Sequence, residues 1–241
     1  MGLAVRIIPT LLKRGAHLVK GKRFSADRVV GHVEQAARIH QARGVDELII
    51  LDIDATPSGR GPDFAAIESL TAKCFMPLTV GGGVRSIADV EDLLRAGADK
   101  VAIRTLIDKE PDTVERICRR FGCQAIVAAV DYENRIPTLA AGTTPIWCTF
   151  LEAIGVGEIL LTCVEAEGTM SGYDTNMIEA VVAQVDCPVI AHGGCSGPED
   201  MLKAIQAGAS AVAAGALFQF TDHTPQSCAK WLAEHGVEVR V

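Results

Sequence analysis

Short apolar runs alternate with segments of helical periodicity eight times along the chain. Several of the runs are continuously apolar, which is typical of parallel strands buried on both faces. They predict strands near residues 5–10, 47–53, 77–81, 99–104, 124–131, 157–163, 188–192 and 210–216. Helices are predicted near residues 31–43, 63–73, 86–96, 110–121, 145–154, 174–184, 197–207 and 224–234. Eight strand-then-helix units favour a (β/α)8, or TIM, barrel over a doubly wound open sheet.

Two glycine-rich turns occupy equivalent places in the two halves of the chain. Val80-Gly81-Gly82-Gly83 and Ala191-His192-Gly193-Gly194 each end an apolar strand and precede a helix, and they lie 111 residues apart. The same offset relates Gly44-Val45-Asp46-Glu47 to Gly155-Val156-Gly157-Glu158. Because one register holds across two strand–turn–helix units, the sequence predicts a barrel with an internal two-fold half-barrel repeat.

Composition adds limits on organisation and partners. The 241 residues are 49% hydrophobic with no Pro-, Ser- or charge-rich linker, which predicts one domain over residues 1–241. The formal net charge of −7 argues against a nucleic-acid surface. The eight cysteines include no C-x-x-C, so we expect reduced thiols without a metal site or cofactor. No apolar segment reaches the roughly 20 residues that span a bilayer, and a cytoplasmic protein without membrane contact is expected.

The glycine turns are candidate phosphate sites. In a TIM barrel the chemistry lies at the C-terminal ends of the strands, and exposed backbone N–H groups there bind anions. Tight helix packing is the alternative explanation for an isolated glycine pair. Two related pairs facing each other favour a small substrate with phosphate at both ends. The residues concerned are Gly82, Gly83, Gly193 and Gly194, with Arg104, Thr105, Gly215 and Ala216 after neighbouring strands.

The chain resembles, over nearly its whole length, the cyclase (HisF-like) subunits of imidazole glycerol phosphate synthase. The resemblance rests on Leu78-Thr79-Val80-Gly81-Gly82-Gly83, on Gly168-Thr169-Met170-Ser171-Gly172-Tyr173-Asp174, and on residues 6–9, 19–21, 46–48, 51–53, 97–101 and 157–162. It implies a barrel that takes ammonia from a glutaminase (HisH-like) partner and uses it on a bis-phosphorylated substrate. Further substrate-binding positions implied by the resemblance are Lys20, Thr162, Glu167, Gly168 and Thr169.

The resemblance also implies an ammonia gate at the N-terminal face of the barrel. Its two basic and two acidic residues correspond to Arg6, Glu47, Lys100 and Glu158, each at or near the start of a predicted strand. A purely structural ion-pair ring is the alternative. The glutaminase would dock on this face, with Asp99 as a contact.

The catalytic end departs from the family pattern, which uses aspartates at the ends of strands 1 and 5. Asp131 ends the fifth predicted strand, but Leu12 stands at the strand-1 position and cannot transfer a proton. Asp52 and Asp54 are candidates for the missing carboxylate, Asp54 on condition that the second strand extends that far; a solvated loop aspartate is the alternative. Arg104, Gly215 and His192 are further departures around the substrate site.

Three functions follow from these residues. The intact gate and Pro-x-Leu-Leu-Lys at the first strand resemble a paralogous group linked to converting acetamido sugars of surface polysaccharides to acetamidino sugars. A HisF-like ammonia-handling enzyme of that kind, with a phosphorylated substrate, is the leading hypothesis. An authentic cyclase of histidine biosynthesis is the second. A catalytically silent, glutaminase-binding ammonia conduit is the third.

Overall fold

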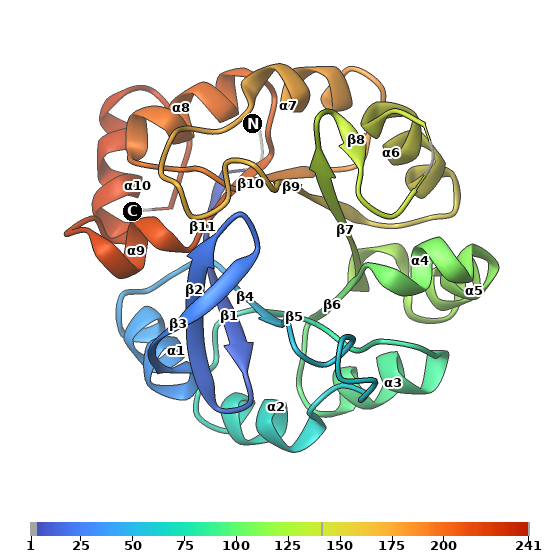
Figure 1. Cartoon of the computed structure of the whole chain (residues 1–241). Coiled ribbons are helices and arrows are strands. Elements are labelled where there is room, and N and C mark those ends of the chain that lie inside the picture. Colours follow the sequence, from blue (N-terminus) through green and yellow to red (C-terminus); the bar gives the residue numbers. More distant parts are fainter. Residues whose placement is uncertain (1–3, 141, 241) are drawn as a thin grey trace.

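The computed structural model describes residues 4–140 and 142–240 of the chain. Within them, eight parallel strands close into a barrel, because the last of these strands pairs with the first. The barrel strands are β1 (Arg6–Arg14), β4 (Leu48–Asp52), β5 (Leu78–Gly81), β6 (Lys100–Ile103), β7 (Ile126–Glu133), β9 (Glu158–Cys163), β10 (Val189–His192) and β11 (Ala211–Ala214). Figure 1 shows helices surrounding this inner ring of strands. The predicted (β/α)8 barrel is confirmed.

Helices between the strands cover the outside of the barrel. They are α1 (Val33–Ala42), α2 (Phe64–Thr71), α3 (Ile87–Arg95), α5 (Pro111–Phe121), α6 (Thr144–Ala153), α7 (Thr175–Val182), α8 (Pro198–Gln206) and α10 (Pro225–Glu234). Side-chain caps start several of them, as where Ser86 accepts a hydrogen bond from the Asp89 amide of α3. Helices α6, α7 and α8 each begin and end 111 residues after α1, α2 and α3. The structure therefore carries the same internal repeat as the sequence.

Three features were absent from the sequence-based prediction. The first strand continues to Arg14 and is followed by an antiparallel hairpin of β2 (His17–Lys22) and β3 (Ser25–His32). Short helices α4 (Thr105–Lys109) and α9 (Ala216–Phe220) follow β6 and β11. Strand β7 continues through a tight turn into β8 (Ile136–Pro137) and a 3-10 turn, η1 (Cys123–Ala125), precedes β7. The hairpin replaces the start of a helix predicted from residue 31, because backbone pairing with β1 extends to Arg14.

Apolar side chains fill both the barrel interior and the layer between strands and helices. The interior cluster consists of small and branched side chains that are all at most 4% exposed, namely Ile8, Ile49, Ala102, Val127, Leu160, Ile190, Ala211 and Ala213. The larger outer cluster joins the strands to the surrounding helices. All eight cysteines are free thiols. No helix among the described residues has the length and hydrophobicity needed to cross a bilayer.

Candidate active site

A cavity of about 500 Å³ opens at the C-terminal ends of the barrel strands. Its floor is apolar, with Leu12, Leu51 and Leu160 in the lining, and Phe24 and Ser25 of the β2–β3 connection line it as well. Ten of the predicted site residues face this cavity: Asp52, Asp54, Gly82, Gly83, Arg104, Thr105, Asp131, Thr162, Glu167 and His192. The hairpin therefore shapes the site, although the sequence did not predict it.

A smaller void of about 10 Å³ adjoins the cavity at strands β10 and β11. Glu167 and His192 line both spaces. The predicted residues that face only the smaller void are Lys20, Gly168, Gly193, Gly194, Gly215 and Ala216. Thr169 lines neither space, and its hydroxyl bonds to the Ala166 carbonyl and to Ser171. The two predicted phosphate sites thus differ in their surroundings.

Asp131 is nearly buried at the end of β7 and is paired with a cation. The Nε atom of Arg104 lies 2.5 Å from Oδ2 of Asp131, whose side chain is 10% exposed. The same guanidinium donates a hydrogen bond of 2.9 Å to the Thr138 hydroxyl. Burial raises the pKa of the Asp131 carboxyl above its ordinary value, while Arg104 and the Thr162 hydroxyl oppose that rise. Arg104 thus holds the carboxylate, across the cavity from Leu12.

Asp52 is occupied by structural partners. Its Oδ1 atom accepts hydrogen bonds of 3.1 Å from the amides of Asp54 and Ala55, and Arg60 contacts both oxygens at 2.9 and 3.0 Å. The ammonium of Lys13 lies 3.4 Å from Oδ2. A carboxylate held by two cations and two backbone amides is stabilised in its charged form. This geometry favours a role in shaping the loop after β4 over proton transfer by Asp52.

Asp54 does not continue the face of β4, as the sequence analysis had required. The strand ends at Asp52, and residues 53–59 form turns in which the Ser58 amide donates to the Asp54 carbonyl. The carboxylate lies 3.5 Å from Arg14 and its side chain is 39% exposed. The expectation that the strand would extend through residue 54 is wrong, because the Asp52 side chain captures the next backbone amides and turns the chain. Asp54 reaches the cavity from a loop instead.

Both glycine turns need glycine for steric reasons. Gly82 has a φ of +110°, and a β-carbon there would lie 2.3 Å from the Asp52 carbonyl oxygen. Gly194 has a φ of +101°, and its β-carbon would lie 2.1 Å from the Gly172 carbonyl oxygen. Both conditions exclude a side chain. The turns therefore bring backbone of adjacent strand ends into direct contact.

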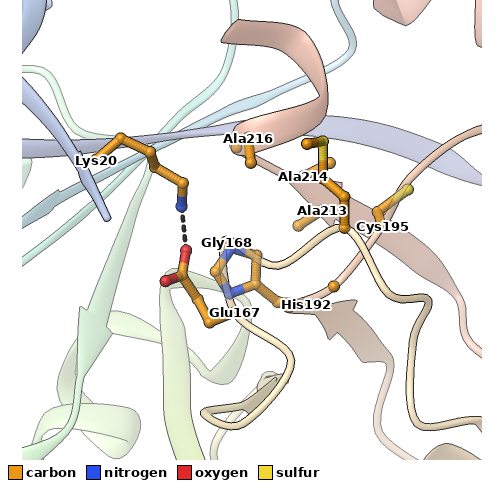
Figure 2. Close-up of a pocket in the computed structure, with 12 residues that line it drawn as sticks. Lys20, Glu167, Gly168, His192, Cys195, Ala213, Ala214 and Ala216 are labelled. Carbon is orange, nitrogen blue, oxygen red and sulfur yellow. Dashed lines mark hydrogen bonds and ion pairs between the residues drawn. The ribbon is translucent and has the colours of Figure 1, made fainter. Parts of the chain in front are cut away.

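A buried cluster of charged and polar side chains closes the strand β10 end of the cavity (Figure 2). Lys20 of β2 pairs with Glu167, and their side chains are 2% and 3% exposed. His192 lies beside them and its Nδ1 atom is 3.1 Å from the Thr162 hydroxyl. Burial, with the neighbouring Lys20 charge, lowers the pKa of His192 to about 3. The imidazole is therefore neutral near pH 7.

A closed ring of four ion pairs forms the floor of the barrel. Arg6 contacts Glu47 at 2.7 Å and Glu158 at 3.1 Å, and Lys100 contacts the same two carboxylates at 3.1 and 3.0 Å. The Thr79 hydroxyl donates to Glu47 at 2.6 Å. Burial is the largest influence on the pKa of Arg6 and lowers it, but Glu158 and Glu47 together raise that pKa above its ordinary value. All four residues singled out in the sequence thus meet in one charge-balanced ring.

Several residues that shape the site escaped the sequence analysis. Lys13 and Arg60 fix Asp52, and Thr138 steadies Arg104. The signal for Lys13 was its place in an alternating strand, but its partner Asp63 lies 50 residues away. Among residues 4–140 and 142–240, no three His, Cys, Asp or Glu side chains are grouped in a way that would hold a metal ion.

Comparison with known proteins agrees with the barrel and its gate residues. The model of a family described as "Histidine biosynthesis protein" matches residues 6–224. The imidazole glycerol phosphate synthase subunit HisF of Dictyoglomus thermophilum is 39% identical, covering 99% of both chains. The corresponding HisF of Corynebacterium diphtheriae is 40% identical over the full length of both. A Campylobacter jejuni protein named putative imidazole glycerol phosphate synthase subunit hisF2 is 38% identical, again covering 99% of both chains.

Proposed function

Since the chain belongs to the histidine biosynthesis protein family, as a relative of its HisF subunits, we propose that it is an ammonia-using synthase subunit of a glutamine amidotransferase. The ring of Arg6, Glu47, Lys100 and Glu158 is the observation that carries this proposal. Partly buried charges cost desolvation that apolar packing would avoid, so a ring used only for packing has little advantage. A glutaminase would bind the floor of the barrel beside this ring, near the exposed Asp99.

The barrel interior supports a path for ammonia from the ring to the cavity. Above the ring lies the interior apolar cluster around Ile8, Ile49 and Leu160, and above that lie Leu12 and Leu51 in the cavity floor. Neutral ammonia crosses apolar surroundings at far lower cost than ammonium does, and a dry path also keeps it unprotonated. Each cation of the ring bridges both carboxylates, so passage requires one cation to swing outward. The cations are the more exposed members, with side chains 24% and 18% exposed.

The reaction at the upper end differs from imidazole ring closure in this proposal. Leu12 removes one of two acid–base groups, and Arg104 holds the other, Asp131, in an ion pair. The loss of one partner of such a pair reduces a rate by about 10²–10⁴-fold. We therefore favour a phosphorylated compound on the route to acetamidino sugars as the substrate, in line with the resemblance to the paralogous cyclase group.

Authentic imidazole glycerol phosphate synthesis is the second candidate. The presence of Asp131 at the end of β7 and the names of the HisF relatives favour it. Here Asp54 would supply the second proton-transferring group, since Asp52 is occupied by Arg60 and Lys13.

One assay separates the candidates. Purified protein is incubated with the bis-phosphorylated ribulosyl precursor of imidazole glycerol phosphate and ammonium salt at alkaline pH, and the loss of precursor absorbance is followed. We expect no turnover. A rate in the range of about 1–10³ s⁻¹, common among enzymes, would refute the acetamido-sugar proposal and restore the histidine pathway.

The ammonia path has its own test. The protein is combined with a HisH-type glutaminase, and glutaminase turnover is compared between the native chain and Glu47→Gln. We expect complex formation and altered turnover in the variant. Asp131→Asn is the matched change at the other end of the barrel. Unchanged activity in that variant, with an altered Glu47→Gln variant, would indicate a conduit without chemistry of its own.

A further inference from the structure

The two glycine turns end in unequal spaces. The turn at Gly82 and Gly83 opens on the cavity of about 500 Å³. The turn at Gly193 and Gly194 faces the void of about 10 Å³, which has room for about one water molecule. A phosphate group presents three oxygens beyond its ester link and does not fit a void of one water. The internal repeat therefore carries two related turns with different capacities.

Charge differs between the two ends as strongly as space does. At the β10 end, the ammonium of Lys20 is already paired with Glu167, and both side chains are at most 3% exposed. His192 beside them is neutral, as its lowered pKa shows. A phosphate placed there would meet the Glu167 carboxylate and would compete with it for the only ammonium lining the void. At the opposite end, the Arg104 side chain is 39% exposed on the cavity.

The hydrogen-bonding groups at the β10 end suit a neutral donor. Glu167 lines the main cavity and accepts hydrogen bonds. The Thr162 hydroxyl, which lowers the pKa of Asp131 by a hydrogen bond to it, accepts at the same time from Nδ1–H of His192. This arrangement leaves Nε2 of His192 as a second acceptor. A hydroxyl or amide N–H group would satisfy both residues without adding charge.

We infer that the ligand of this cavity carries a single phosphate, bound at the Arg104 end, and an uncharged hydrogen-bond donor at the Glu167 end. This inference rests on the proposed function in taking the ligand to be a phosphorylated small molecule. It narrows the substrate class from bis-phosphorylated to mono-phosphorylated compounds. Lys20 then serves to fix Glu167, and the second glycine turn serves packing alone.

Binding stoichiometry with inorganic phosphate tests the inference. Isothermal titration of the native chain should give one site. Arg104→Leu should remove that site, and Glu167→Gln, which frees the Lys20 ammonium, should add a second. Two sites in the native chain would overturn the inference, as would a site that survives Arg104→Leu.

A second variant covers the case in which Glu167→Gln does not fold. Replacing Lys20 and Glu167 together by Met keeps the buried pair neutral and apolar, and such replacements are often neutral for stability. This double variant should keep the single phosphate site with its affinity within about threefold of the native value. Loss of the site would place the phosphate at Lys20 and would overturn the inference.

Paired sugar phosphates separate failure of the inference from failure of the proposed function. Ribulose 5-phosphate and ribulose 1,5-bisphosphate are titrated against the native chain. Equal or weaker binding of the bisphosphate is expected, and a preference for the bisphosphate of tenfold or more would overturn the inference alone. If neither compound nor inorganic phosphate binds, the phosphorylated substrate of the proposed function falls as well.

Discussion

Removal of one charge from the floor ring should destabilise the protein more than removal of two opposite charges would suggest by addition. Lys100→Met leaves Glu47 and Glu158 with Arg6 as their one shared cation, and Glu47→Gln leaves two cations around Glu158. Complete loss of a partner in a buried pair costs about 3–5 kcal/mol. Each remaining ring member keeps an opposite charge and the cations are partly exposed, so we expect about 2 kcal/mol for each single variant.

The double variant restores a neutral floor. It retains the Arg6–Glu158 pair at 3.1 Å and should cost less than the two single changes together, by about 1–2 kcal/mol. Urea unfolding followed by circular dichroism at 222 nm gives the three free energies of unfolding. The exposed pair of Lys73 and Glu34, at 2.7 Å, provides the control, in which the same substitutions should show no measurable coupling. Additive costs in the ring, within about 0.5 kcal/mol, would refute the electrostatic coupling of the four residues.

Three further predictions concern the upper end of the barrel. Arg104→Ala should raise the pKa of Asp131 further, because the cation that opposes the effect of burial is gone; a carboxyl ¹³C titration in which that pKa falls would contradict this. Gly82→Ala should destabilise the fold by more than about 2 kcal/mol, since its β-carbon would meet the Asp52 carbonyl, whereas Gly15→Ala, with φ +58° and open space around it, should cost about 1 kcal/mol in chemical denaturation. His192 is neutral in the fold with a pKa of about 3, so the unfolded chain binds more protons below the ordinary pKa of 6.5, and stability should fall with pH from 6.5 downward. Between pH 7 and 5 this loss is about 2 kcal/mol and should be absent from the pH profile of His192→Asn; parallel profiles would count against a buried neutral imidazole.

The barrel itself was predictable because its signals are local. Each parallel strand buries both faces and so appears as an apolar run, and each helix carries its own periodicity and caps. The repeat of 111 residues was equally visible, and the helices of the two halves follow it. The β2–β3 hairpin was missed because its alternating residues lie between two stronger signals, and its pairing with β1 depends on strand register.

The candidate site was only partly predictable. The sequence identified Asp131, and the structure adds that Arg104 of the neighbouring strand end holds its carboxylate. It also singled out Asp52 and Asp54, but the pairing of Asp52 with Arg60 and the turn after β4 followed from contacts within the folded loop. The inequality of the two glycine turns was hidden as well, since Lys20 and Glu167 are 147 residues apart.

The sequence by itself determined the fold class, the internal repeat and the four charged residues at the starts of strands. Only the tertiary structure decided how those charges pair, which carboxylates are already occupied, and which glycine turn has room beside it. The physical reason is that burial patterns and turn chemistry are properties of short segments. Distances such as the 3.1 Å between Arg6 and Glu158, which are 152 residues apart, exist only once β11 has closed the barrel against β1.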